Sequence, residues 1–143
     1  MAQIRIREGS LEEILDVRTE FDLAFDKAYF ENRYKDKEKL LLIAEQETIN
    51  VGFIVAYDRD DDRSLYCWMA GVIPQYRSQG AFGLLMKFMD KWAKEKGYNK
   101  IKIKTHNNFR QMLMYLVKNG FNFTLIEPAE NILDYSIHVE KEL

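Results

Sequence analysis

Short stretches of hydrophobic residues, some of them alternating with polar ones, divide this chain into predicted strands and helices. At the start, isoleucine alternates with polar residues over residues 3–7, as in a half-buried strand. Ser10 and Glu13 have the spacing of a capping box, which predicts a helix from there to about Phe21. Residues 22–37 are rich in both aromatic and charged side chains and are predicted to form a second helical stretch.

Three apolar stretches in the middle of the chain predict further strands, at residues 40–44, 51–57 and 65–72. Residues 47–50 have the character of a hairpin turn, so the first two of these strands are expected to pair antiparallel. A polar, acidic loop at residues 58–63 leads into the third strand and is expected to be solvated.

An amphipathic helix is predicted from about Gly80 to Lys96. Gly97 is suited to end it, because glycine readily adopts the left-handed conformation that follows many helices. The hydrophobic side chains recur at helical spacing on one face, which is expected to pack against a sheet. They are Phe82, Leu85, Met89 and Trp92.

The C-terminal third predicts a strand, a helix and two more strands. Isoleucine alternates with lysine over residues 101–104, as in a strand. Asn107 or Asn108 can cap the next helix through its side chain. The hydrophobic stripe of that helix consists of Phe109, Met112, Leu113, Leu116 and Val117. The last two strands are predicted at residues 121–126 and 133–139.

The order of these elements predicts an α/β fold of the α+β type, with a single mixed, mostly antiparallel sheet and helices on both faces. The strands at 65–72 and 101–104 are expected to be parallel, because the helix between them makes a right-handed crossover connection. We find no internal repeat and no low-complexity linker. A length of 143 residues suits one domain, residues 1–143, with a buried core.

Charge and composition limit the functions that the chain can have. Lys and Arg number 21 and Asp and Glu number 23, and the resulting net charge of −2 argues against a nucleic-acid-binding surface. No apolar run predicts a membrane span, and the first residues lack the apolar core of a signal peptide, so a cytoplasmic location is expected. Cys67 is the only cysteine, which excludes an internal disulfide. The two histidines do not have the spacing of metal ligands, so no metal is expected. A homodimer is a possible assembly.

The strongest functional signal lies in residues 72–86, where an apolar strand is followed at once by a loop and an amphipathic helix. The first turn of a helix has free N–H groups, and its macrodipole places about half a positive charge there. Gly80 has no Cβ, so a phosphate can come close to the backbone, and Arg77 adds a positive charge. The stretch therefore predicts a phosphate-binding loop. The simpler alternative is a plain connection in which Gly80 and Gly83 serve only turn geometry.

This stretch resembles the pyrophosphate-binding loop of the GNAT superfamily of acyl-CoA-dependent N-acetyltransferases. The family's loop is Arg/Gln-x-x-Gly-x-Gly/Ala, and Arg77 and Gly80 fit it. Phe82 stands at the sixth position, where the family has a small residue, and Gly83 follows one place later. The resemblance also covers the order of elements over nearly the whole chain, including an Asn-Gly-Phe at residues 119–121 like the Gly-Phe that ends the family's next helix.

The resemblance implies an acyl-CoA-dependent N-acyltransferase that moves acetyl from acetyl-CoA to a primary amine of a small molecule or peptide. It implies that the two parallel strands separate and that the pantetheine arm lies between them. A backbone N–H near residues 70–72 would stabilise the carbonyl oxygen as charge develops on it. The residues implied to contact the cofactor are Val72, Ile73, Arg77, Ser78, Gln79, Gly80, Ala81, Phe82, Gly83 and Asn108. The alternative function is an acyl-CoA-binding or sensing domain with little or no transferase activity.

The acid that protonates the leaving thiolate has two candidate positions. In relatives it is a tyrosine four residues before the Gly-Phe, and that count leads here to Leu116. Counting instead from Asn108, matched to the asparagine that begins this helix in relatives, leads to Tyr115. Helical periodicity favours the Leu116 register, since Tyr115 lies about 130° from the apolar stripe. Tyr115 is retained as the candidate catalytic residue, and Tyr66 and Tyr76 are alternatives that are more often packing residues.

The base that deprotonates the amine is also open. Many relatives carry a glutamate on the strand before the loop, but residues 65–71 contain no carboxylate. Glu45 or Glu47, at the end of the preceding hairpin, and a chain of water molecules are the alternatives. Cys67 is expected to be a small core side chain, and His106 a solvated residue at the end of a strand.

In relatives the segment after the first helix covers the acceptor site. Here its aromatic residues are interspersed with Asp22, Asp26 and Glu31, which would suit a cationic amine. Core packing by Phe21 and Phe25 is the alternative. The expected partners are therefore acetyl-CoA and an amine, with neither nucleic acid nor membrane.

Overall fold

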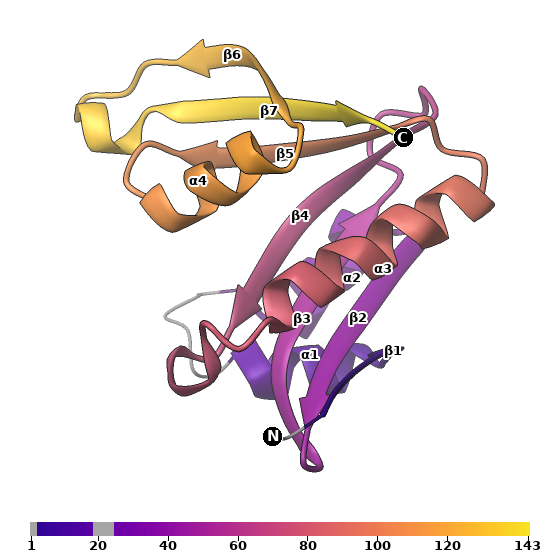
Figure 1. The fold of residues 1–143 in the computed structure, drawn as a ribbon. Coiled ribbons are helices and arrows are strands. Elements are labelled where there is room, and N and C mark those ends of the chain that lie inside the picture. Colours follow the sequence, from indigo (N-terminus) through magenta and orange to yellow (C-terminus); the bar gives the residue numbers. More distant parts are fainter. Residues whose placement is uncertain (1–2, 19–24) are drawn as a thin grey trace.

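The computed structural model describes residues 3–18 and 25–143. One seven-stranded sheet, in the order β1-β2-β3-β4-β5-β7-β6, carries helices on both faces (Figure 1). The elements are β1 (Ile4–Glu8), α1 (Leu11–Arg18), α2 (Lys27–Arg33), β2 (Lys39–Gln46), β3 (Ile49–Tyr57), β4 (Ser64–Val72), η1 (Pro74–Tyr76), α3 (Ala81–Glu95), β5 (Lys100–His106), α4 (Arg110–Lys118), β6 (Asn122–Glu127), η2 (Ile132–Asp134) and β7 (Ser136–Glu142). No helix in this described part of the chain is long and apolar enough to cross a membrane.

The pairing of the strands confirms the predicted mixed, mostly antiparallel sheet. Strands β1 to β4 pair antiparallel in chain order, and β7 pairs antiparallel with both β5 and β6. Only β4 and β5 are parallel among the described strands, and α3 connects them as predicted. This crossover brings the start of α3 close to the end of β4.

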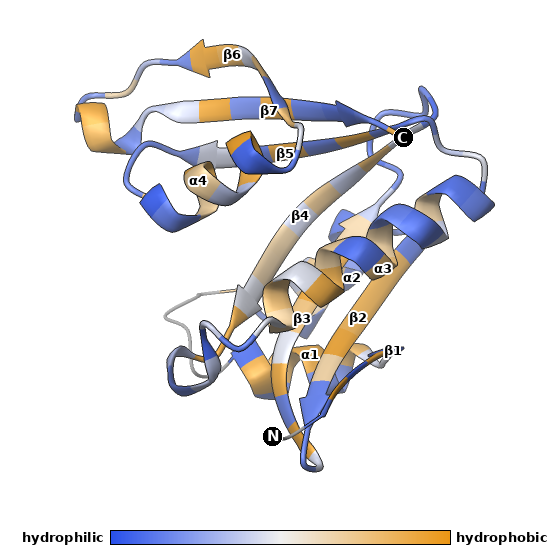
Figure 2. Cartoon of the chain, in the orientation of Figure 1, coloured by the Kyte–Doolittle hydropathy of each residue, from blue (hydrophilic) through white to orange (hydrophobic). Residues whose placement is uncertain are grey.

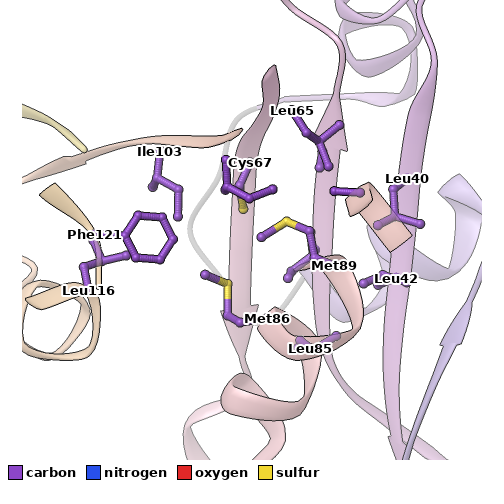
Figure 3. Close-up of a cluster of buried hydrophobic side chains, with 14 of the residues drawn as sticks. Leu40, Leu42, Leu65, Cys67, Leu85, Met86, Met89, Ile103, Leu116 and Phe121 are labelled. Atoms are coloured by element: carbon purple, nitrogen blue, oxygen red, sulfur yellow. The ribbon is translucent and has the colours of Figure 1, made fainter. Parts of the chain in front are cut away.

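The core has two parts, one on each face of the sheet. Helices α3 and α4 cover one face, and α1 and α2 cover the other (Figure 1). Beneath α3, the side chains of Leu85, Met86 and Met89 meet Leu65 and Cys67 of β4 (Figure 3). Figure 2 shows that β2 is hydrophobic along most of its length, as expected of a strand buried on both faces, whereas hydrophobic and polar residues alternate along β5, as expected of a strand buried on one face.

The first helix begins as its sequence predicts. The Glu13 N–H donates to Ser10 Oγ at 3.2 Å, and the Ser10 N–H donates to Glu13 Oε1 at 3.1 Å, so the capping box is formed. Helix α1 ends at Arg18, and the predicted extension to Phe21 lies outside the described residues.

The second helix is shorter than predicted within the described part of its stretch, residues 25–37. Helix α2 covers Lys27–Arg33 of these residues, and residues 22–24 lie outside the described residues. Asp26 determines its start, because the Asp26 carboxylate accepts a hydrogen bond of 2.9 Å from the Tyr29 N–H as an N-cap.

The predicted asparagine cap of α4 is wrong. The N-cap is Phe109, and no side chain caps the helix there. Asn107 Nδ2 donates instead to the Ile132 carbonyl at 2.9 Å, and the Asn108 N–H donates to the Leu133 carbonyl at 3.0 Å. Both asparagines hold the turn before β7, and because that turn forms η2, the strand begins three residues later than predicted.

The acidic loop between β3 and β4 is not simply solvated. Lys102 Nζ on β5 donates to Asp62 at 2.7 Å and to Asp60 at 3.1 Å. The ammonium holds the pKa of the Asp62 carboxyl well below its usual range. These ion pairs connect the loop to β5 at the end where β4 and β5 are still paired.

Candidate active site

The phosphate-binding loop predicted from the sequence lies between the end of β4 and the start of α3. Gly80 is the N-cap of α3 and has a φ of 97°, in the left-handed region that favours glycine. The first intrahelical bond runs from the Leu84 N–H to the Gly80 carbonyl at 3.1 Å. The amides of residues 81–83 therefore have no acceptor within the helix and are free for an anion.

Side chains of the loop between β4 and α3 attach it to the sheet, and one of them also provides a positive charge. Arg77 Nε donates to the Val72 carbonyl at 2.9 Å, which fixes the loop against the end of β4. The Gln79 amide oxygen accepts from Gln46 Nε2 of β2 at 2.9 Å. The Ile73 N–H donates to the Val51 carbonyl at 2.8 Å, so it is not available to the cofactor.

The two parallel strands separate next to this loop, as the resemblance implied. Their paired residues run from Ser64↔Lys100 to Cys67↔Ile103 and end there, while β5 continues beside β7 to His106. From residue 68 to 72, β4 is paired with β3 alone. Alternate backbone groups of this segment have no strand partner on the β5 side.

The separation begins at a β-bulge. Val55 pairs with Met69 and Ala56 with Cys67, so that Trp68 is the extra residue on β4. Because of the bulge, the side chains of Trp68 and Met69 both pack on the α2 side, whereas Cys67 and Ala70 pack on the α3 side.

Helix α4 lies across the opening from α3. Leu116 is fully buried in the core with Phe121 and Ile103, as the helical periodicity predicted (Figure 3). Tyr115 is half-buried, and its ring meets the ring of Phe82 with centroids 4.9 Å apart and an interplanar angle of 80°. Burial raises the pKa of Tyr115, and the Asp90 carboxylate adds to this effect, so the hydroxyl keeps its proton at neutral pH.

The other candidate acids and bases lie in an ion pair, in a turn or in the core. Glu45 Oε1 accepts from Arg7 Nε at 3.3 Å, and Glu47 lies in the β2–β3 turn. Tyr66 is buried on the opposite face from α3 with Arg59 stacked at 3.8 Å from its ring centroid. Burial raises the pKa of the Cys67 thiol to about 12, so this side chain is an unreactive part of the core.

The acidic residues expected at the acceptor site do not gather there. The Asp26 carboxylate caps α2, and Glu31 faces a groove that it lines with Leu11 and Lys35 on the α1 side. Asp22 lies outside the described residues. The side of α2 that faces β4 presents Phe30 and Arg33 instead, a placement that their spacing of three residues could have indicated.

Residues 77–83 lie between η1 and the first turn of α3, and Asn108 lies between the end of β5 and the start of α4. Among residues 3–18 and 25–143, no group of three or more His, Cys, Asp or Glu residues could hold a metal ion. A mixed sheet whose parallel strands separate beside a glycine-capped helix has the architecture of the GNAT acetyltransferases.

Comparison with known families agrees with this architecture. The chain matches the acetyltransferase (GNAT) family over residues 10–121, and it therefore belongs to that family. A comparison with curated protein sequences gave no match.

Solved structures of similar fold are acetyltransferases. The IAA acetyltransferase from Bacillus cereus ATCC 14579 has a TM-score of 0.82 at 18% identity, covering 99% of this chain and 100% of its own. The ribosomal-protein-S18-alanine N-acetyltransferase from Escherichia coli has a TM-score of 0.83 at 12% identity, covering 98% and 94%. A GNAT family acetyltransferase from Elizabethkingia anophelis with acetyl-CoA bound has a TM-score of 0.74 at 21% identity, covering 98% of each chain. At these identities the similarity shows a common fold.

Proposed function

We propose that this acetyltransferase moves an acetyl group from acetyl-CoA to a primary amine of a small molecule or peptide. One observation carries the proposal: the free amides at the start of α3 lie directly beside the segment where β4 leaves β5. An anion site next to unpaired strand backbone suits a cofactor with a pyrophosphate and an extended, amide-containing arm. The acetyl-CoA bound to the Elizabethkingia anophelis protein of the same fold supports the choice of cofactor.

Each part of the site has a distinct role in this proposal. The amides of residues 81–83 would bind the pyrophosphate, and Arg77 would add positive charge beside it. Residues 68–72 of β4 would pair with the arm as a neighbouring strand would. An N–H near residues 70–72 would donate to the carbonyl oxygen as the amine attacks and negative charge develops there.

Tyr115 is the proposed acid. Its hydroxyl would protonate the thiolate as it leaves, and the raised pKa keeps that proton in place at neutral pH. Glu45, Glu47 and water are the candidate bases. The amine must be neutral to attack, so the rate is expected to rise with pH until the amine is fully deprotonated.

Release of free CoA thiol tests the proposal. The protein is mixed with acetyl-CoA and a panel of primary amines, and the acetylated amine is identified by mass spectrometry. Amine-dependent thiol release is expected. Cofactor binding without such release across the panel would support the alternative, an acyl-CoA-binding or sensing domain.

A cytoplasmic location and a homodimer remain predictions. The exposed side chains of Phe123, Leu125 and Ile126 on the edge strand β6 support association with a second copy. Light scattering during gel filtration tests the dimer, and cell fractionation tests the location.

A further inference from the structure

Arg33 on α2 is held in one orientation by two contacts with the sheet. Its guanidinium carbon lies 5.0 Å from the centroid of the Trp68 ring on β4. Its Nε donates to the Tyr57 hydroxyl of β3 at 2.7 Å. A guanidinium fixed at Nε and by ring stacking presents its two Nη groups as a rigid fork.

No carboxylate among the described residues pairs with this guanidinium, and none of their oxygens accepts from its Nη groups. Arg59, which also stacks on an aromatic ring, differs in this respect because Asp60 binds it at 2.9 Å. Arg33 is also exposed, so a ligand can reach it. A planar, charged fork whose Nη groups have no acceptor among the described residues suits an anion with two oxygens, such as a carboxylate or a phosphate.

The place of this fork in the fold connects it to the acetyl-transfer site. Its stacking partner Trp68 is the bulged residue and the first residue of β4 beyond the last β4–β5 pair. The Trp68 ring packs on the α2 side, opposite α3. The Arg33 guanidinium therefore lies on the α2 side of the sheet, beside the first residue of β4 that is no longer paired with β5.

We infer that the acceptor amine carries an anionic group, a carboxylate or a phosphate, which Arg33 binds through its Nη groups. The inference rests on the proposed function, and it replaces the expectation of an acceptor held as a cation by Asp26 and Glu31. The anion would fix the orientation of the acceptor and leave its amine to face the acyl group.

The test compares matched amines that differ in the anion. Alanine, phenylalanine, glutamate and lysine are each compared with their own α-carboxamide, and phosphoethanolamine with ethanolamine, with rates expressed per neutral amine. For at least one pair, kcat/KM is expected to be about 10- to 100-fold higher with the anion, the range for a hydrogen bond to a charged group. The amino acid arm identifies a carboxylate, and the phosphoethanolamine arm identifies a phosphate.

Variants of Arg33 then test whether this residue causes the preference for anionic amines. Arg33→Gln is expected to remove it, and Arg33→Lys to keep only part of it, because lysine retains the charge without the fork. Arg59→Gln and Glu31→Gln are matched controls that should leave it unchanged. Each variant must keep the thermal stabilisation by CoA, which shows that the cofactor site is intact.

A binding measurement separates this inference from the proposed function. Titration calorimetry of the same amines into CoA-loaded protein requires no transfer. Anion-dependent binding that Arg33→Gln and Arg33→Lys weaken would support the anion site even if no amine were acetylated. Equal rates and equal affinities within every pair, or a preference that survives Arg33→Gln, would overturn the inference and leave acetyl transfer standing if any amine is acetylated.

Discussion

The ring of Phe82, the second residue of α3, meets the ring of Tyr115 on α4 edge-on, with centroids 4.9 Å apart. The two residues mark the two places where the sequence departs from the family pattern. Phe82 stands where relatives have a small residue, and Tyr115 stands one place from the expected tyrosine. Their contact brings the two positions together, because the large side chain of Phe82 packs beside the Tyr115 ring.

This contact changes what is expected of Tyr115→Phe. Periodicity alone favours Leu116 in the acid position, and a loss of less than tenfold would follow. The structure buries Leu116 fully and places the Tyr115 ring against Phe82 in the first turn of α3. We therefore expect Tyr115→Phe to lower kcat by about 10²- to 10⁴-fold, the range for general acid catalysis, with unchanged CoA affinity. A loss below tenfold in a folded variant would restore the Leu116 register.

Phe82→Ala is expected to act through Tyr115. An edge-to-face contact worth about 1 kcal/mol corresponds to a roughly fivefold change in the equilibrium between held and released tyrosine, so kcat should fall by up to about that factor. The double variant Phe82→Ala/Tyr115→Phe should be no slower than Tyr115→Phe alone, because the second change removes the group that Phe82 positions. Multiplicative losses would show that the residues act independently. Trp92→Ala, a partly buried aromatic on the same helix, is the control and should leave kcat unchanged.

The parts of the site that could be predicted from the sequence are local ones. Gly80 before an amphipathic run predicts the N-terminus of α3, since both signals lie within one turn of the chain. The separation of β4 and β5 follows from the family resemblance, because no residue of either strand indicates where pairing ends.

The parts that could not be predicted depend on contacts between distant elements. Asn107 is a residue type that often caps helices, but its side chain donates a hydrogen bond to the Ile132 carbonyl instead. Asp62 belongs to a loop of solvated character, yet Lys102 on β5 pairs with it. Arg33 becomes a candidate ligand only through its contacts with Tyr57 on β3 and Trp68 on β4, two elements distant from it in the sequence.

Gly80→Val is expected to abolish the thermal stabilisation by CoA. The φ of 97° disfavours a β-branched residue, and a side chain at this position would stand where the phosphate approaches. Gly97→Val controls for backbone strain, since Gly97 has a φ of 93° at the opposite end of α3, and it should lower the melting temperature without loss of CoA binding. Gly83→Ala should keep CoA binding, because Gly83 lacks the positive φ of Gly80, its amide is retained, and an added Cβ meets no protein atom within 4 Å. Retained stabilisation in Gly80→Val, measured by differential scanning fluorimetry, would contradict the assignment of the loop.

Glu13 is expected to make the fold sensitive to acid. Arg7 Nη2 lies 2.5 Å from Glu13 Oε2, and this hydrogen bond lowers the pKa of the carboxyl from its ordinary 4.5 to about 2. A depressed pKa in the folded state means that the unfolded chain binds more protons, so the stabilisation is present above about pH 4.5 and is lost as the pH falls towards 2. Urea unfolding of the wild type and of Glu13→Gln should therefore differ most above pH 4.5 and converge near pH 2. Glu95 has no ion-pair partner among the described residues, so the free energy of unfolding of Glu95→Gln should follow that of the wild type across this pH range. A constant difference between the wild type and Glu13→Gln across the same range would show that the charge of Glu13 is not what stabilises the fold.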